Sequence, residues 1–185
     1  MVANLDNGLI FIVGTLLQIA LGLLLARVLL QLVRADFFNP ISQLVWKLTQ
    51  PVVRPLLALL PRWRTLDLAG GLLLYALAVI YVELLASLYG FDVPIGYALV
   101  QALLKLASLT LNLYTLSLFA QALLSWIGPG VSNPAANVLW SLNEPLLRPV
   151  RRILPPIGGI DLSPVPVMLL LQLVDRLLPL APFFH

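Results

Sequence analysis

The chain has 185 residues, of which 61% are hydrophobic and only 10% charged, with a formal net charge of +3. So few polar residues cannot cover the core of a soluble domain of this length, which excludes that class and predicts a membrane-embedded protein. The absence of cysteine excludes disulfides, iron–sulfur ligation and thiol nucleophiles. Because the only histidine is His185, a histidine-based metal or haem site has no ligands, and no metal or other cofactor is expected.

The first half of the chain is predicted to contain two membrane spans. A hydrocarbon core about 30 Å thick needs roughly 20 apolar residues in a helix, and residues 9–33 and 68–89 meet this requirement. No Lys or Arg precedes the first run, so we expect a retained helix rather than a cleaved signal peptide. Between the runs, residues 40–50 carry apolar side chains at helical spacing, which predicts an amphipathic helix that Pro51 interrupts.

The second half is predicted to contain two further spans. The third lies within residues 93–127 and is expected to start near Ala102. The fourth, at residues 165–180, is the shortest of the four apolar runs. A proline-rich basic loop separates them, as it separates the first two spans.

The two halves are copies of one unit. Residues 39–68 align with residues 133–162 without a gap, at an offset of 94 residues, and eleven of the thirty aligned positions are identical. We predict an all-α membrane protein of four transmembrane helices, divided into residues 1–91 and 92–185. Its two helix–amphipathic loop–helix repeats are expected to be parallel, related by a pseudo-two-fold axis along the membrane normal. The repeat motif comprises Asn39, Pro40, Pro51, Pro55 and Asp67 in the first copy and Asn133, Pro134, Pro145, Pro149 and Asp161 in the second.

Several motif residues have a predicted structural role. Asn39 is expected to cap the amphipathic helix, since asparagine caps well and Pro40 is tolerated at the first helical position. Trp46 suits the headgroup level of a membrane. Asp67 and Asp161 precede the second span of each copy and are expected to cap it, with Ser163 as a competing cap in the second copy. The alternative, a catalytic aspartate pair, has no base or metal ligand nearby, so no catalytic residue is expected.

Basic residues mark one side of the membrane. They concentrate in the loops that follow the first and third spans, with Arg27 just inside the end of the first span. The N-terminus, residues 90–94 and the tail after Arg176 contain none. The positive-inside rule therefore places both basic loops in the cytoplasm and both termini outside. The loop residues expected to dock anionic lipid or partners, or else only to anchor the topology, are Lys47, Arg54, Arg148, Arg151 and Arg152.

Four charged residues fall inside the predicted spans, namely Glu83, Lys105, Asp175 and Arg176. Charge is costly in hydrocarbon, so each needs a partner. At about 1.5 Å per residue, Glu83 lies about 9 Å below the outer end of the second span. Lys105, near the start of the third span, is expected at a similar depth, so we expect the two to pair, with Arg176 as the next candidate. These charges either fix helix register as buried ion pairs or line a polar path.

Residues 144–164, which read EPLLRPVRRILPPIGGIDLSP, resemble the signature of the YggT family, called YlmG in Gram-positive bacteria and cyanobacteria. Residues 36–40 and 49–51 resemble its first-copy motif, although residues 61–67 lack the glycine turn of the second copy. The resemblance covers the whole chain and implies a multi-pass protein of the bacterial inner membrane. It implies no established catalysis. It links such proteins to osmotic or ion homeostasis, to cell division and nucleoid distribution, and in plastids to haem attachment during cytochrome assembly.

Three function classes follow. The duplicated basic loop favours a non-enzymatic scaffold or assembly factor, whose cytoplasmic amphipathic loops dock lipids or proteins. The intramembrane charges favour an ion- or osmolyte-handling protein in osmotic stress, which would be oligomeric because four helices make a poor pore. An intramembrane enzyme has the least support. The expected partners are anionic lipids of the inner leaflet. Membrane proteins and further copies of the chain are possible additional partners, and no nucleic acid is expected.

Overall fold

The computed structural model describes residues 2–57, 68–127, 133–154 and 161–184. Within these ranges the chain is all helical, as predicted, and contains no strand. Its elements are α1 (Val2–Leu32), α2 (Pro40–Leu57), α3 (Leu68–Leu88), α4 (Ile95–Ile127), α5 (Pro134–Arg151), α6 (Pro164–Leu177) and the short 3₁₀ helix η1 (Pro182–Phe184).

The predicted internal repeat is present in the fold. Helices α1, α2 and α3 recur in the same order as α4, α5 and α6, and α5 begins and ends 94 residues after α2. The predicted cap at Asn39 is confirmed, and Asn133 caps α5 in the same way. The side-chain oxygen of Asn39 accepts from the backbone N–H of Ile41 at 2.9 Å, and Asn133 accepts from Ala135 at the same distance. The copies also touch, because the Asn39 amide donates to the carbonyl of Pro134 at 2.7 Å.

In the part of the chain that the structure describes, three helices are long and apolar enough to cross a membrane, at Gly8–Leu32, Leu68–Leu88 and Ile95–Ser125. Helix α4 contains the predicted third span and extends beyond it at its N-terminal end. Helix α4 begins at Ile95, directly after Pro94, whose carbonyl accepts from the backbone N–H groups of Tyr97 and Ala98. Lys105 therefore lies about 15 Å from the start of α4, at about 1.5 Å per residue.

Helix α6 is the exception in length. Its 14 residues span about 21 Å, short of the roughly 30 Å of a hydrocarbon core. The helix stops at Leu177 because Pro179 disfavours helical geometry in the preceding residue, and Leu178 is extended, with ψ of 131°. The fourth span thus stays a prediction.

The amphipathic helices are continuous, so the predicted interruption at Pro51 is wrong. Helix α2 runs through Pro51 and Pro55, and α5 runs through the equivalent prolines. An interior proline costs about 3 kcal/mol of helix stability. In α2 the burial of Thr49 and Val53 opposes that cost, while both prolines lie on the exposed side. The apolar residues Leu44, Leu48 and Val52 point away from the protein, each more than half exposed.

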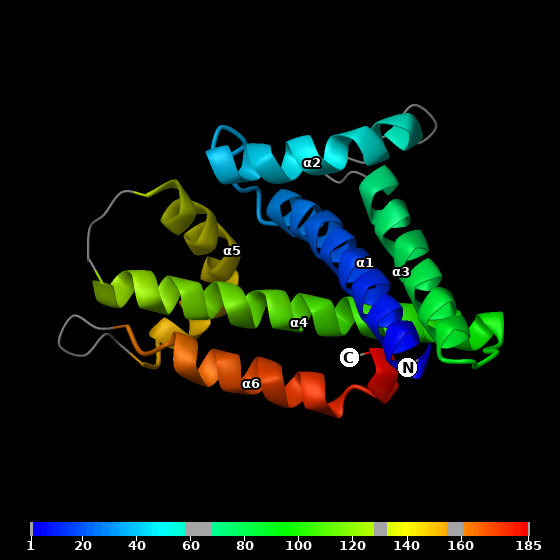
Figure 1. Cartoon of the computed structure of the whole chain (residues 1–185). Helices are drawn as coiled ribbons and strands as arrows, with labels where there is room; N and C mark the ends of the chain where they lie inside the picture. Colours follow the sequence, from blue (N-terminus) through cyan, green and yellow to red (C-terminus); the bar gives the residue numbers. More distant parts are fainter. Residues whose placement is uncertain (1, 58–67, 128–132, 155–160, 185) are drawn as a thin grey trace.

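The helices diverge from one end of the molecule (Figure 1). Both termini and the connection between α3 and α4 lie at that end, whereas α2 lies across the opposite ends of α1 and α3 (Figure 1). Helix α4 is central and packs on α3, α5 and α6. Small side chains at Ala78, Ala98 and Ala102 are fully buried in the core, where they allow close helix contact.

Candidate functional site

An arginine of α1 is fixed against α2 in the first copy. Arg27 is 1% exposed, and its Nη1 donates to Thr49 Oγ1 at 3.0 Å and to Gln50 Oε1 at 3.1 Å. Its guanidinium carbon lies 3.7 Å from the centre of the Trp46 ring, a cation–π contact. The side chain thereby joins the last turns of a candidate span to the amphipathic helix.

The second copy builds a similar cluster from a different position. Arg151, at the end of α5, contacts Glu144 Oε2 at 2.6 Å and lies 5.4 Å from the Trp140 ring. Glu144 and Trp140 are the repeat equivalents of Gln50 and Trp46 at the offset of 94. Each copy thus presents a guanidinium to its tryptophan and to the polar residue four positions later, although the arginine comes from α1 in one copy and α5 in the other.

The side-chain contact between the first helix and the amphipathic helix occurs at equivalent positions in the two copies. Gln121 stands where the first copy has Arg27, and its Oε1 accepts from Asn143 Nδ2 at 2.8 Å. Asn143 is the equivalent of Thr49. Sequence reasoning treated Arg27 only as a basic residue near a helix end and missed this contact. Extending the repeat comparison into the first span would have paired Arg27 with Gln121.

Asp161 organises the start of α6 in the second copy. Its carboxylate accepts from the Ser163 backbone N–H at 2.9 Å, from the Ser163 hydroxyl at 2.5 Å and from Arg151 Nε at 2.9 Å. Burial acts to raise the pKa of Asp161, but the bonds from Ser163 and Arg151 outweigh it and hold the pKa below its ordinary value. The residue before α6 is Ser163, so Asp161 braces the cap position rather than occupying it. Asp67 and His185 lie outside the described residues.

The basic loop residues differ in their surroundings. Lys47, Arg54, Arg148 and Arg152 are exposed, whereas Arg151 is held by Glu144 and Asp161. The four exposed side chains are free to reach a lipid surface or a partner, and Arg151 is committed to internal ion pairs.

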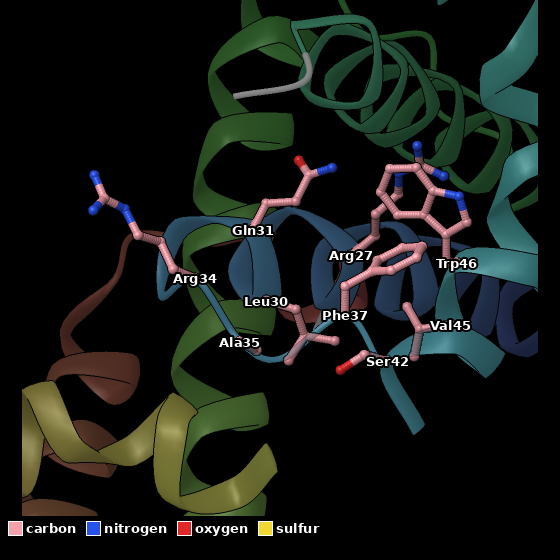
Figure 2. A pocket seen from close by; sticks show the side chains of 9 residues that line it. All are labelled: Arg27, Leu30, Gln31, Arg34, Ala35, Phe37, Ser42, Val45 and Trp46. Atoms are coloured by element: carbon pink, nitrogen blue, oxygen red, sulfur yellow. The ribbon is translucent and has the colours of Figure 1, made fainter. Parts of the chain in front are cut away.

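A pocket of about 350 Å³ opens between the end of α1 and the start of α2. Figure 2 shows the rings of Phe37 and Trp46 close together on one side of it and Arg34 on the other. The two rings meet edge to face, with centres 5.5 Å apart. Its nine lining residues are Arg27, Leu30, Gln31, Arg34, Ala35, Phe37, Ser42, Val45 and Trp46.

The expected ion pair between Glu83 and Lys105 is wrong. Lys105 Nζ instead donates to the backbone carbonyl of Phe184 at 2.6 Å and lies 5.0 Å from the Tyr81 ring. Lys105 lies ten residues into α4, beside the C-terminal segment, whose backbone carbonyl takes the place expected for a carboxylate. Among the residues that the structure describes, Glu83 forms no ion pair and is half-buried.

The other two intramembrane charges also lie apart from Glu83. Asp175 Oδ2 accepts from Asn112 Nδ2 at 3.2 Å, and Arg176 is exposed. Asn112 belongs to a line of polar residues along α4, at the helical spacing of Gln101, Lys105, Ser108 and Asn112. Asn112 also borders a second pocket, of about 410 Å³, between α4 and α6.

Comparison with known proteins gives one family. The CCB3/YggT family model matches residues 7–88 and again residues 100–182. An uncharacterised protein of Pseudomonas aeruginosa is 38% identical over 176 residues, which cover 94% of this chain and 89% of that protein. The uncharacterised protein YggT of Escherichia coli K12 is 38% identical over 169 residues, 91% of this chain and 88% of YggT. An uncharacterised protein of Vibrio alginolyticus is 37% identical over 175 residues, 93% of this chain and 94% of that protein. No solved structure matches.

Proposed function

This chain belongs to the CCB3/YggT family, and from that premise we propose that it is a non-enzymatic scaffold or assembly factor of the bacterial inner membrane. It acts through a surface formed by α2 and α5, which we name the interfacial platform. The observation that carries this proposal is the outward apolar face of α2, Leu44, Leu48 and Val52, beside the exposed Lys47 and Arg54. An apolar stripe flanked by basic side chains suits a helix lying in the headgroup region.

The proposal includes four membrane crossings, with both termini outside. Two contacts support a fourth crossing despite the short α6. One end of residues 161–184 is tied to α5 through Asp161 and Arg151. At the other end, the ring of Phe183 stacks on Phe91, in the connection between α3 and α4, with ring centres 5.5 Å apart. The segment therefore reaches from the platform side to the end of the molecule where the termini lie (Figure 1).

The second amphipathic helix extends the platform. Trp140 on α5 is 56% exposed, and Arg148 and Arg152 are exposed near its end. Both amphipathic helices thus present an aromatic or apolar surface with cations, which suits the anionic inner leaflet, where each basic residue contributes about 1 kcal/mol. The ion pairs of Glu144 and Asp161 with Arg151 give these carboxylates a structural role, which favours a scaffold over an enzyme.

Photo-crosslinking in living cells tests the platform. A photoreactive residue at Leu48 is expected to give discrete protein adducts as well as lipid adducts. The matched control is Leu103 on α4, which is 58% exposed but lies outside the platform. Identical adducts at Leu48 and Leu103, or lipid adducts alone at both, would refute a scaffold that works through α2.

Ion or osmolyte handling is the second candidate, and the polar line along α4 favours it. The side chains that form this line share one face of a candidate span; they are Gln101, Lys105, Ser108 and Asn112. In a single chain Lys105 is already hydrogen-bonded to the Phe184 carbonyl. Transport would therefore need an oligomer or release of the C-terminal segment. Liposome flux that is lost in Ser108→Ala and Asn112→Leu variants, with the Leu48 adducts unchanged, would favour this candidate.

A further inference from the structure

A buried hydroxyl in the α1–α2 pocket lacks a partner. Ser42 is 8% exposed, and its Oγ forms no hydrogen bond within the described part of the chain. A buried donor without a partner is costly, and such groups are rare in native structures. Figure 2 shows the hydroxyl turned toward the side of the pocket that Leu30 and Ala35 line. A ligand with an acceptor oxygen would satisfy it.

An arginine at the pocket rim occupies a backbone position suited to glycine. Arg34, two residues after the end of α1, has a φ of 54°, and there Ala35 N donates to Leu30 O and Arg34 N donates to Gln31 O. Helix α3 ends with the same pattern of bonds, but there the positive φ of 78° belongs to Gly90. A Cβ atom makes this conformation sterically unfavourable, whereas glycine adopts it without strain. The chain thus places a guanidinium beside the pocket at the expense of helix-end stability.

The second repeat lacks these polar groups. At the offset of 94, Ser42 corresponds to Ala136 and Arg34 corresponds to Gly128. The repeat scaffold therefore does not require either side chain. Both belong to a feature that the first copy alone carries in its sequence.

The pocket walls combine positive charge with apolar surface. Two of the nine lining residues are arginines and none is acidic, while Leu30, Phe37, Val45 and Trp46 supply apolar and aromatic walls. The nearby Asp36 is exposed, and its carboxylate accepts from the backbone N–H of Phe38 at 2.9 Å. A volume of about 350 Å³ is at the lower end of ligand pockets and accommodates a headgroup with its glycerol, not the acyl chains.

We propose that this pocket binds one anionic phospholipid. The phosphate accepts from the Ser42 hydroxyl, and the Arg34 guanidinium, which Figure 2 shows directed away from Ser42, turns toward it. The glycerol lies against Leu30 and Val45, and the acyl chains pass Phe37 into the membrane. This inference rests on the interfacial placement of α2 in the proposed function. It adds a single site to what is otherwise a diffuse attraction of the platform for anionic lipid.

Native mass spectrometry of the purified full-length protein tests the site. Phosphatidylglycerol is titrated against phosphatidylcholine with the same acyl chains, and one phosphatidylglycerol is expected to bind preferentially. Arg34→Gly should weaken this first binding event about fivefold while raising the unfolding temperature of the lipid-free protein. Ser42→Ala should weaken it about tenfold without destabilising the lipid-free protein.

The control is Arg148→Gln, which removes an exposed cation from α5 and should leave the first binding event unchanged. Equal weakening by Arg34→Gly and Arg148→Gln would show that lipid binding depends only on surface charge, and it would overturn the proposed site. Binding of soluble glycerol 3-phosphate without preferential binding of phosphatidylglycerol would assign the pocket to a free phosphate ester and also overturn the proposal. Because Leu48 crosslinking is measured independently in cells, loss of the lipid site would leave the platform proposal standing.

Discussion

Lys105 and Phe184 are joined by a buried hydrogen bond from Nζ to the backbone carbonyl, 2.6 Å long, and the two residues are only 1% and 0% exposed. Gln101, one turn earlier on α4, holds the same segment twice. Its Nε2 donates to the Pro179 carbonyl at 3.3 Å, and its Oε1 accepts from Ala181 N at 3.1 Å. One face of α4 therefore fixes the C-terminal segment through its backbone N–H and carbonyl groups.

Gln101→Leu should release that segment. The change leaves the Pro179 carbonyl and the Ala181 N–H unpaired, each at a cost of about 1–3 kcal/mol. The unfolding temperature in detergent should fall, and a cysteine at the buried Leu180 should react faster with maleimide. Gln172→Leu, at an exposed glutamine of α6, is the matched control and should change stability by less than about 0.5 kcal/mol. Unchanged labelling of the Leu180→Cys variant would show that Gln101 does not hold the segment.

Glu83→Gln and Lys105→Met should have additive effects on the free energy of unfolding. The two residues do not contact each other, and Lys105 has the Phe184 carbonyl and the Tyr81 ring as partners. A double-mutant cycle should therefore give a coupling energy below about 0.5 kcal/mol. Coupling of several kcal/mol would reinstate the ion pair expected from the sequence.

Much of this architecture was predictable because it depends on pattern alone. The apolar runs located α1 and α3, and the register of the repeat located α2 and α5 together with the Asn39 and Asn133 caps. The partner of Lys105 was not predictable, since any residue type offers a carbonyl and Phe184 gives no sequence signal. The continuity of α2 was missed because tertiary burial of Val53 overrides the effect of Pro51 on an isolated helix.

Arg151→Leu should destabilise the second copy by about 1–3 kcal/mol, because it leaves Glu144 and Asp161 facing each other without their shared cation. Partial exposure of all three side chains keeps the loss below that of a fully buried pair. The neighbouring Arg152 is exposed, so Arg152→Leu removes the same charge at a cost below about 0.5 kcal/mol. Chemical unfolding of both variants should separate them. Equal losses would mean that net charge matters and the Glu144–Arg151–Asp161 cluster does not.

Acid should weaken the start of α6 through Asp161. The pKa of this carboxyl is lower in the folded chain than its ordinary value of 3.8, so ionised Asp161 stabilises the fold above that value. As the pH falls below about 4 toward the folded pKa, this contribution is lost. Asp161→Asn should therefore be less stable than the wild type at pH 7, with a smaller further loss between pH 5 and pH 3. Thermal unfolding across that range checks it, and parallel curves would exclude Asp161 as a source of the acid sensitivity.

Membrane topology can be read directly because the natural chain contains no cysteine. Single cysteines at Phe38, 82% exposed, and at Ile153, 81% exposed, should react with an impermeant maleimide only after the inner membrane is opened. Cysteines at Asp92 and Pro182, both exposed, should react in cells with only the outer membrane permeabilised. Asp92 reports whether α3 returns to the outer side, as the distribution of basic residues requires.

Pro182 reports on the fourth crossing, where helix length and tertiary contacts disagree. Helix α6 alone is too short to span, yet the stacking of Phe183 on Phe91 ties the C-terminal segment to the α3–α4 connection. If that contact reflects the membrane-bound state, cysteines at Asp92 and Pro182 must label from the same side. Labelling of Pro182→Cys only after the inner membrane is opened would leave three crossings and place the C-terminal segment with the platform. That outcome would also break the parallel relation of the two repeats, since α6 would then no longer cross the membrane as α3 does.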